Sequence, residues 1–310
     1  MENQIKIMDL LDKKANKEKE LNALIYGSIE IREQENNKYI YTHTKIDGIS
    51  RAKYIGEYSE DLYNLILNNN IKSKELKKEI RDLTKELKNL GYIDEELTKE
   101  VTVNIDFARK HLAETIYKQA ILEGIATTLL DTENIIEGGK VSNMSSEDIL
   151  KIVNLKHAWE FILNKNVMLS PTNFYLLCSI NKIVEEGFYY NAGNIRTVPV
   201  KIGGTSWAPS IPIESDIKEE INRIINANGD VVDISIELLL YAVKKQIFID
   251  GNKRSSVIFA NHYLISHGKG LIVIPAEKVD RYKKLLINFY ENNDSKEIHK
   301  FIKEECYLKI

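Results

Sequence analysis

The strongest constraint on the fold is a helical spacing of apolar residues that continues, with few breaks, from about residue 101 to near the end of the chain. It predicts helices at roughly 104–130, 145–165, 171–186, 214–227, 233–246, 253–267 and 276–291. Two stretches break the pattern. The first, GNIRTVPVKIGGTSWAPSIP at 193–212, contains three prolines and cannot be helical, so we expect a hairpin or an arm over the surface. The second is IDGNKR at 249–254.

The first hundred residues have a different pattern, so we expect two domains, 1–100 and 101–310. After an amphipathic opening helix, the stretch at 27–58 alternates apolar and polar residues, which predicts a three-stranded meander. Asp47-Gly48 is a strong hairpin signal for its second turn. The expected architecture is a small α+β N-terminal domain followed by a mainly α domain.

An apolar seam follows the meander. Ser59 is the expected N-cap of a short helix, and Gly91 is the expected end of the next one. That next helix has apolar residues at alternating steps of four and three, namely Leu76, Ile80, Leu83, Leu87 and Leu90. Two heptads are too few for a free coiled coil. The seam therefore packs either within its own domain or against a second subunit, and a homodimer stays open.

The charge balance argues against polyanionic partners. The chain has 43 basic and 46 acidic residues, a net charge of -3, so we expect no nucleic-acid or membrane partner. Its two cysteines, Cys178 and Cys306, do not make a disulfide framework. No segment approaches the roughly 18 apolar residues that span a bilayer, and the opening residues do not resemble a secretory signal. We expect a soluble, cytoplasmic protein.

The loop at QIFIDGNKRSS has the composition of a phosphate site. Gly251 allows a ligand to approach the main chain closely, and the amides that follow open a helix whose dipole attracts anions. Lys253 and Arg254 add positive charge, and Asp250 could hold Mg²⁺ together with phosphate oxygens. The alternative is a plain turn between two helices. Taken alone, the tripeptide Asp250-Gly251-Asn252 would favour that alternative.

Three separated motifs change this balance, because together they resemble the Fic/Doc (Fido) family. The core motif of that family has the form H-x-F-x-(D/E)-G-N-(G/K)-R-x-x-R, and six of its positions match here: Phe248, Asp250, Gly251, Asn252, Lys253 and Arg254. The GNIRTVPVKIGG stretch resembles the segment that leads into the family's flap. KQAILEGIATT is similar to the inhibitory motif (S/T)-x-x-x-E-(G/N), with Glu123 and Gly124 in place. The resemblance covers roughly residues 100–290.

The resemblance implies a Fic-type helical bundle with a β-hairpin flap that binds ATP, or another nucleotide, with Mg²⁺. Such proteins usually transfer AMP to a hydroxyl of a target protein, and some move other phosphate-containing groups. Asp250 would then bind the metal, and the phosphates would lie against a second set of residues: Gly251, Asn252, Lys253 and Arg254. A target protein of unknown identity would dock on the flap, at Val198, Val200 and Ile202.

The core motif is degenerate, however. The catalytic histidine of the family aligns with Gln246, whose amide cannot take a proton near neutral pH. Removing a general base typically costs about 10² to 10⁴ in rate. The last arginine of the motif aligns with Val257, which leaves Glu123 without its usual partner, and the (S/T) position aligns with Gln119. Whether Lys253 or Arg254 substitutes is left open by the sequence.

No histidine offers an obvious replacement for the missing catalytic base. His262 lies about 12 Å beyond Arg254 along the predicted helix and is expected to be structural. Glu123 is the better candidate for a base, although it could equally mark a kink between two helices. The sequence therefore favours, narrowly, a nucleotide-binding sensor or interaction module without efficient transfer. The alternative is an active transferase with an unusual catalytic residue such as Glu123. A third possibility is that Gln246 was introduced to inactivate an enzyme. The missing arginine at Val257 argues against it, because one substitution would suffice.

Overall fold

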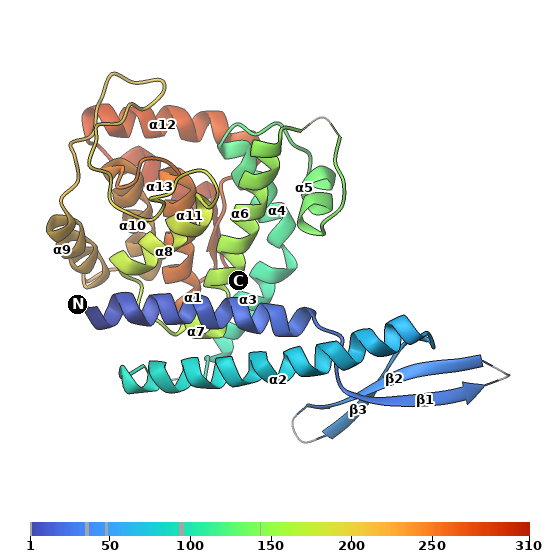
Figure 1. Cartoon of the computed structure of the whole chain (residues 1–310). Helices are drawn as coiled ribbons and strands as arrows, with labels where there is room; N and C mark the ends of the chain where they lie inside the picture. Colours follow the sequence, from blue (N-terminus) through green and yellow to red (C-terminus); the bar gives the residue numbers. More distant parts are fainter. Residues whose placement is uncertain (1, 35–36, 47–48, 93–95, 143) are drawn as a thin grey trace. The chain divides into compact units, whose positions relative to one another are not determined.

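The computed structural model describes residues 2–34, 37–46, 49–92, 96–142 and 144–310. The chain divides into two compact units, Met1–Ile93 and Asp94–Ile310 (Figure 1). The predicted turn at Asp47-Gly48 lies outside the described residues.

The first unit combines two helices with an antiparallel meander. Helix α1 spans Glu2–Ala23, and the strands are β1 (Ser28–Gln34), β2 (Asn37–Ile46) and β3 (Ile49–Glu57), paired in the order β1-β2-β3. Ile40 and Thr42 of the central strand are buried. Tyr41 points to the opposite face, because side chains alternate along a strand, and its ring contacts that of Tyr54. The predicted three-stranded meander is confirmed.

Helix α2 differs from the prediction because it is one continuous helix, Glu60–Asn89, rather than a short helix followed by a second. Ser59 caps it as expected, by accepting a hydrogen bond from the amide of Leu62. The asparagines in its middle are tied to the preceding turn, where the Asn70 side chain bonds both backbone groups of Gly27. These bonds offset the poor helix propensity of asparagine. The apolar seam packs against α1, within the same unit.

The second unit is mostly helical, as predicted. Its helices are α3 (Lys99–Lys110), α4 (Leu112–Leu122), α5 (Leu129–Ile136), α6 (Ser146–Ile162), α7 (Lys165–Met168), α8 (Phe174–Val184), α9 (Glu214–Ile225), α10 (Val231–Lys245), α11 (Asn252–Ser266), α12 (Val279–Asn292) and α13 (Lys296–Glu305). A short 3-10 turn, η1 (Ala276–Lys278), precedes α12, and β4 (Leu271–Ile272) pairs with β5 (Tyr307–Leu308). The single helix expected at 104–130 is instead three, interrupted at His111 and again between Leu122 and Leu129.

Helix α11 forms the centre of this unit, with α10, α8 and α6 packed around it (Figure 1). Nearly all of its residues are buried, including the polar Ser255, Ser256, Asn261 and His262. A helix buried on all sides loses the one-sided apolar stripe of a surface helix. Its N-terminus, which follows the IDGN loop, is therefore held by packing from several directions.

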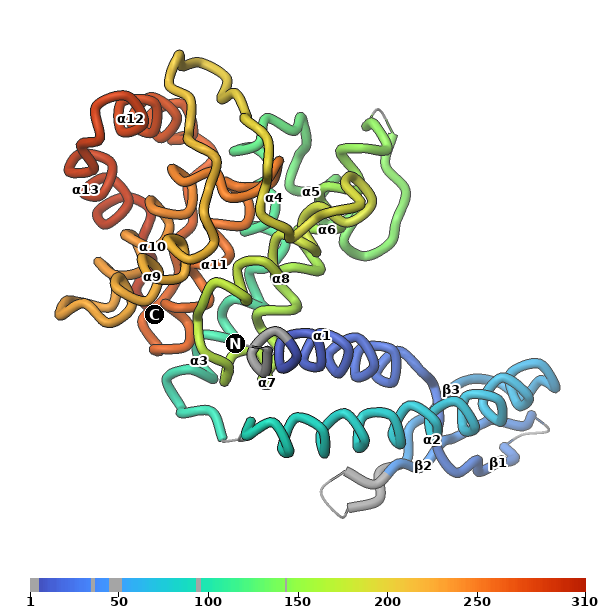
Figure 2. Tube along the Cα trace, turned by 60° about the vertical axis from the view of Figure 1, so that its left-hand side comes forward, coloured from blue at the N-terminus to red at the C-terminus, as the bar shows by residue number. Residues whose placement is uncertain are grey.

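The segment between α8 and α9 is an arm, not the β-hairpin flap that the resemblance implied. All of residues 185–213 are described, and none is in a strand. Pro199, Pro209 and Pro212 have no backbone N–H to donate to a ladder. The arm leaves the bundle beside α8, passes α12 and returns to α9 (Figure 2). Among the described helices, none is long and apolar enough to cross a membrane.

Candidate anion-binding site

The candidate site is the loop that joins α10 to α11. Helix α10 ends at Lys245, and its C-cap residue Gln246 adopts a left-handed conformation with φ 48°. Helix α11 begins at Asn252, after its N-cap residue Gly251 at φ 73°. The side chain of Asn252 closes the loop, because it accepts a hydrogen bond from Phe248 N at 3.0 Å and donates one to Phe248 O at 2.8 Å. The side chain of Asn252 thus shapes the loop, and only the backbone N–H of this residue is left to face a ligand.

The N-terminus of α11 has no side-chain cap. Gly251 is the N-cap residue, so the amides of the first turn at 252–254 lack the oxygen that a serine or aspartate would supply. Asp250 satisfies only the amide before them, since its Oδ1 accepts from Gly251 N at 2.7 Å. The Asp250 side chain is 54% exposed. This combination offers free N–H donors beside an accessible carboxylate.

Arg254 lies in this first turn with its side chain 2% exposed and surrounded by acids. Its Nη2 lies 2.8 Å from Glu185 Oε1 and 3.7 Å from Asp250 Oδ1, and its Nε lies 3.6 Å from Glu123 Oε2. These contacts are ion pairs, but Nε and Nη1 make no hydrogen bond to any described residue. A buried guanidinium with unused donors costs free energy unless a ligand accepts from it. The arrangement therefore fits a phosphate group.

Glu123 ends α4 and reaches this loop. Gly124, at φ 83°, terminates the helix, and the Glu123 carboxylate lies 3.5 Å from Lys253 Nζ as well as 3.6 Å from Arg254 Nε. The question that the sequence left open is answered: both Lys253 and Arg254 face the acid. Glu123-Gly124 marks the end of a helix and also brings the carboxylate to the loop. The two interpretations from the sequence, a break between helices and a residue of the site, are therefore compatible.

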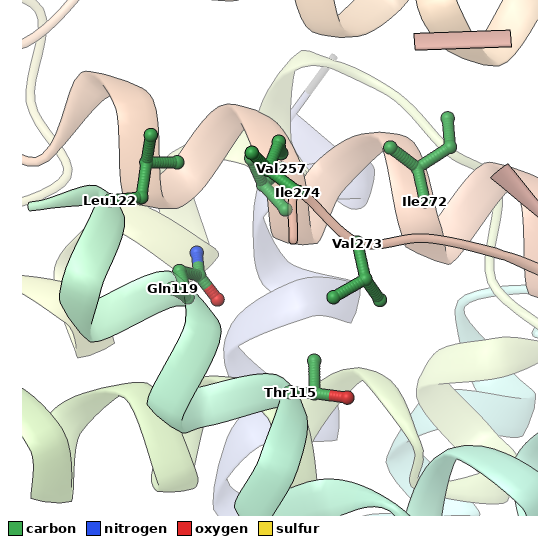
Figure 3. Close-up of a pocket in the computed structure, with 7 residues that line it drawn as sticks. All are labelled: Thr115, Gln119, Leu122, Val257, Ile272, Val273 and Ile274. Atoms are coloured by element: carbon green, nitrogen blue, oxygen red, sulfur yellow. The ribbon is translucent and has the colours of Figure 1, made fainter. Parts of the chain in front are cut away.

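Gln119, at the (S/T) position of the inhibitory motif, joins α4 to the same turn. It is buried, donates to Arg254 O at 2.9 Å and accepts from Trp159 Nε1 at 2.9 Å. Figure 3 shows it beside Val257 in a small pocket whose other lining residues are mostly aliphatic. The pocket volume of about 10 Å³ has room for about one water molecule. Where the family motif has its last arginine, this chain has apolar packing.

Gln246, at the position of the catalytic histidine, caps its own helix. Its Nε2 donates to Val243 O at 2.7 Å, and the residue is 9% exposed. The backbone carbonyl of Gln246 accepts from Arg196 Nε at 2.6 Å. The side-chain Nε2 and the backbone carbonyl of this residue are therefore both engaged inside the protein.

His262 is structural, as expected. It is fully buried, its Nε2 donates to Val167 O at 2.9 Å and its Nδ1 accepts from Thr172 Oγ1 at 2.8 Å. Burial lowers the pKa of the imidazole to about 4. The neutral ring is consequently a fixed crosslink rather than a base for the loop.

Two site residues were missed by the sequence analysis. Arg196, buried at the start of the arm, donates to the carbonyl oxygens of Val198, Ser210 and Gln246, which joins both ends of the arm to the loop. Glu185, the cap of α8, lies under the loop, where burial raises the pKa of its carboxyl to about 7. Neither stands out in the sequence, because an arginine in an arm and a glutamate at a helix end are ordinary.

The three residues expected on the flap have different surroundings. Val198 is exposed and Val200 is partly buried, while Ile202 packs against the core cluster of the helical unit. Trp207, also on the arm, stacks on Tyr290 at 5.2 Å between ring centroids. The arm is thus anchored at Ile202 and Trp207 and open to solvent at Val198.

Comparison with known proteins finds a family match within the second unit. Residues 171–264, which include α8, the arm and most of α11, match the family model described as Fic/DOC family. The chain carries a Fic/DOC family domain. The resemblance noted from the motifs is confirmed, and such domains generally catalyse nucleotidyl transfer such as AMPylation and bind ATP with Mg²⁺.

Solved Fic structures have a similar fold. A Fic domain-containing signaling protein from Bacteroides thetaiotaomicron matches with a TM-score of 0.54 and 19% identity over 67% of this chain and 85% of that one. Fic-1 from C. elegans matches with a TM-score of 0.53 and 16% identity over 78% and 79%. A Fic family protein from Desulfovibrio desulfuricans gives 0.50 and 14% over 67% and 72%. Among curated proteins, no relative matches significantly.

Proposed function

We propose that this Fic/DOC domain binds a nucleotide such as ATP, with Mg²⁺, but transfers AMP inefficiently or not at all, and that it acts as a nucleotide sensor or interaction module. The proposed loss of transfer rests on Gln246, whose side chain forms a hydrogen bond within the protein. Its Nε2 already donates to Val243 O, and an amide cannot remove a proton from a target hydroxyl. Losing a general base costs about 10² to 10⁴ in rate.

The binding half of the proposal rests on the first turn of α11. Arg254 has two buried donors without a hydrogen bond, and the amides at 252–254 have no side-chain cap. These groups would hold phosphate oxygens, with Lys253 adding charge at the rim. Asp250 would hold Mg²⁺, which usually takes one or two carboxylates and completes its shell with phosphate and water. The bound metal would neutralise phosphate charge.

The runner-up function is a transferase that uses Glu123 as its base. One observation favours it: Glu123 Oε1 is buried, lies at the loop and accepts no hydrogen bond from the described residues. Against it, the carboxylate is already engaged in ion pairs with Lys253 and Arg254, at 3.5 and 3.6 Å. In either case a target protein would meet the domain at the exposed part of the arm near Val198.

Two measurements test the proposal. Calorimetry with Mg·ATP should show binding to the full chain and at least about tenfold weaker binding to Asp250→Ala and Arg254→Ala. Incubation with α-labelled and, separately, γ-labelled ATP and cell extract should leave the unaltered chain without label transfer, while Gln246→His is the variant expected to gain it. Glu123→Gly tests the runner-up.

The outcomes separate the two halves of the proposal. Binding that is unaffected by both alanine substitutions would place the nucleotide elsewhere. Label transfer by the unaltered chain would contradict the proposed loss of chemistry, and loss of that transfer in Glu123→Gly would establish the runner-up. Whether a second copy of the chain is a partner is a separate prediction, checked by sedimentation.

A further inference from the structure

Glu185 is a buried acid beside the candidate phosphate loop, at a position for which the motifs assign no role. Its side chain is 2% exposed, and its Oε1 lies 2.8 Å from Arg254 Nη2. A Cβ atom added at Gly251 would lie only 2.4 Å from the same oxygen. The carboxylate therefore packs directly against the backbone of the loop and contacts the arginine in its first turn.

The neighbourhood fixes Glu185 from several elements. Asn154 of α6 donates to Val184 O at 3.2 Å and to Glu186 O at 2.8 Å, the two carbonyls that flank Glu185. Asn181 of α8 donates to Asp250 O at 3.0 Å, which ties the same helix to the loop. The end of α8 and the loop consequently form one hydrogen-bonded unit in which the acid has a defined place.

Arg254 has a divided set of donors as a result. Its Nη2 is in an ion pair with Glu185 Oε1 at 2.8 Å, in a geometry that does not make a hydrogen bond, whereas Nε and Nη1 are buried without a hydrogen bond to the described residues and Glu123 approaches Nε only to 3.6 Å. A guanidinium is a rigid fork, so fixing one corner sets the direction of the other two edges. Arginine also loses side-chain rotamer freedom when it is immobilised. An arginine held before the ligand arrives has already lost that freedom.

We propose that Glu185 is a positioning residue for Arg254, and that by holding Nη2 it directs the remaining donors toward a di- or triphosphate group at the N-terminus of α11. The inference rests on the proposed function, because it names the acid that prepares Arg254 for phosphate. The competing possibility is that Glu185 repels phosphate and blocks the site. If Glu185 positions Arg254, moving its carboxylate should weaken phosphate binding and removing its charge should not. If Glu185 repels phosphate, removing its charge should strengthen binding and moving the carboxylate should have little effect.

The test is calorimetric binding of inorganic tripolyphosphate, without metal, to the full-length chain under mildly alkaline conditions. Glu185→Gln keeps the length of the side chain and an acceptor oxygen, so affinity should stay within about threefold of the unaltered chain. Glu185→Asp keeps the charge but withdraws the carboxylate by one methylene, so the dissociation constant should rise about tenfold. Glu186→Asp, at the exposed neighbouring acid, is the matched control and should change nothing.

A double-mutant cycle separates positioning from a general structural effect. Arg254→Gln should weaken binding by itself, and adding Glu185→Asp to it should cause no further loss, because the residue through which Glu185 acts is gone. Thermal unfolding of each variant reports whether it is folded, and Glu185→Gln supplies an independent reading if the aspartate variant is unstable.

Several results would overturn the inference. Tighter binding by Glu185→Gln with unchanged binding by Glu185→Asp would show that the acid competes with phosphate. Equal losses from Glu185→Asp with and without Arg254 would show a structural effect only. Absence of tripolyphosphate binding by the unaltered chain would reject the proposed function as well, which distinguishes that failure from the failure of Glu185 alone.

Discussion

Arg196 Nε donates a 2.6 Å hydrogen bond to the backbone carbonyl of Gln246, which connects the start of the arm to the residue at the position of the catalytic histidine. The same guanidinium donates to Val198 O at 2.8 Å and Ser210 O at 2.6 Å, at the two ends of the arm. One buried side chain thus holds three backbone segments, the furthest of which, at Gln246, is 50 residues from Arg196 in the sequence. The arm has no strand ladder, so these three hydrogen bonds of Arg196, here called the Arg196 clamp, hold it in place instead.

The first prediction concerns this clamp. Arg196→Lys keeps the charge but replaces a planar fork with a single ammonium, which cannot reach all three carbonyls. We expect the free energy of unfolding to fall by about 3 kcal/mol, because buried carbonyls lose their donors. Urea unfolding of the full chain measures this. The exposed Lys201→Arg on the same arm is the control, and equal stability of the two variants would show that the clamp is dispensable.

The second prediction concerns the glycine at the loop. Gly251 has φ 73°, and an added Cβ would meet Glu185 Oε1 at 2.4 Å. Gly251→Ala should therefore destabilise the chain by about 1 to 2 kcal/mol from the left-handed backbone, and further from the clash. Combining it with Glu185→Ala removes the clash but not the backbone strain. Chemical unfolding of the unaltered chain, the two single variants and the double variant should show that the double variant loses less stability than the sum of the two single losses. Strictly additive losses would contradict the packing described.

The third prediction is a pH dependence. Burial raises the pKa of the Glu185 carboxyl from 4.5 to about 7, although Arg254 favours the charged form. The folded state then binds more protons than the unfolded state between these values, so the contribution of this residue to stability falls as pH rises from 4.5 to 7. Glu185→Gln should remove this slope. The two unfolding free-energy curves should converge at low pH and separate toward pH 7, and parallel curves would refute the assignment.

His262 contributes with the opposite sign over an overlapping range. Burial lowers its pKa from 6.5 to about 4, so the unfolded state takes up a proton first as pH falls. Its stabilising contribution is complete above 6.5 and is lost progressively toward 4. His262→Gln should be less stable at neutral pH and should lose this part of the acid sensitivity. Comparing the variant with the unaltered chain isolates it from the effect of Glu185.

The fifth prediction tests the long helix of the N-terminal unit. Asn70 bonds the amide and the carbonyl of Gly27, whereas Asn68, two residues earlier in α2, is exposed. Asn70→Ala should lower the stability of this unit by about 1 to 2 kcal/mol, and Asn68→Ala should raise it slightly through helix propensity. Circular dichroism during thermal unfolding follows both. Stabilisation by both substitutions would show that the Asn70 bonds contribute little.

The sequence by itself determined the local elements. Six of the seven helices predicted after residue 101 correspond to α6, α8, α9, α10, α11 and α12 within a few residues, because amphipathic spacing and caps act over three or four positions. The loop was visible for the same reason: Asp250, Gly251 and Arg254 are neighbours in the chain, so their chemistry can be read without a fold. The family assignment also followed from short motifs.

Only the tertiary structure decided how the loop is supplied with charge. Glu185 lies 69 positions from Arg254, and Glu123 lies 131 positions away, yet all three meet at one guanidinium. The same holds for the arm, where the Arg196 side chain binds the carbonyls of Val198 and Ser210 and no strand forms. Contacts between distant segments depend on how helices pack, which a periodic pattern along the chain does not specify.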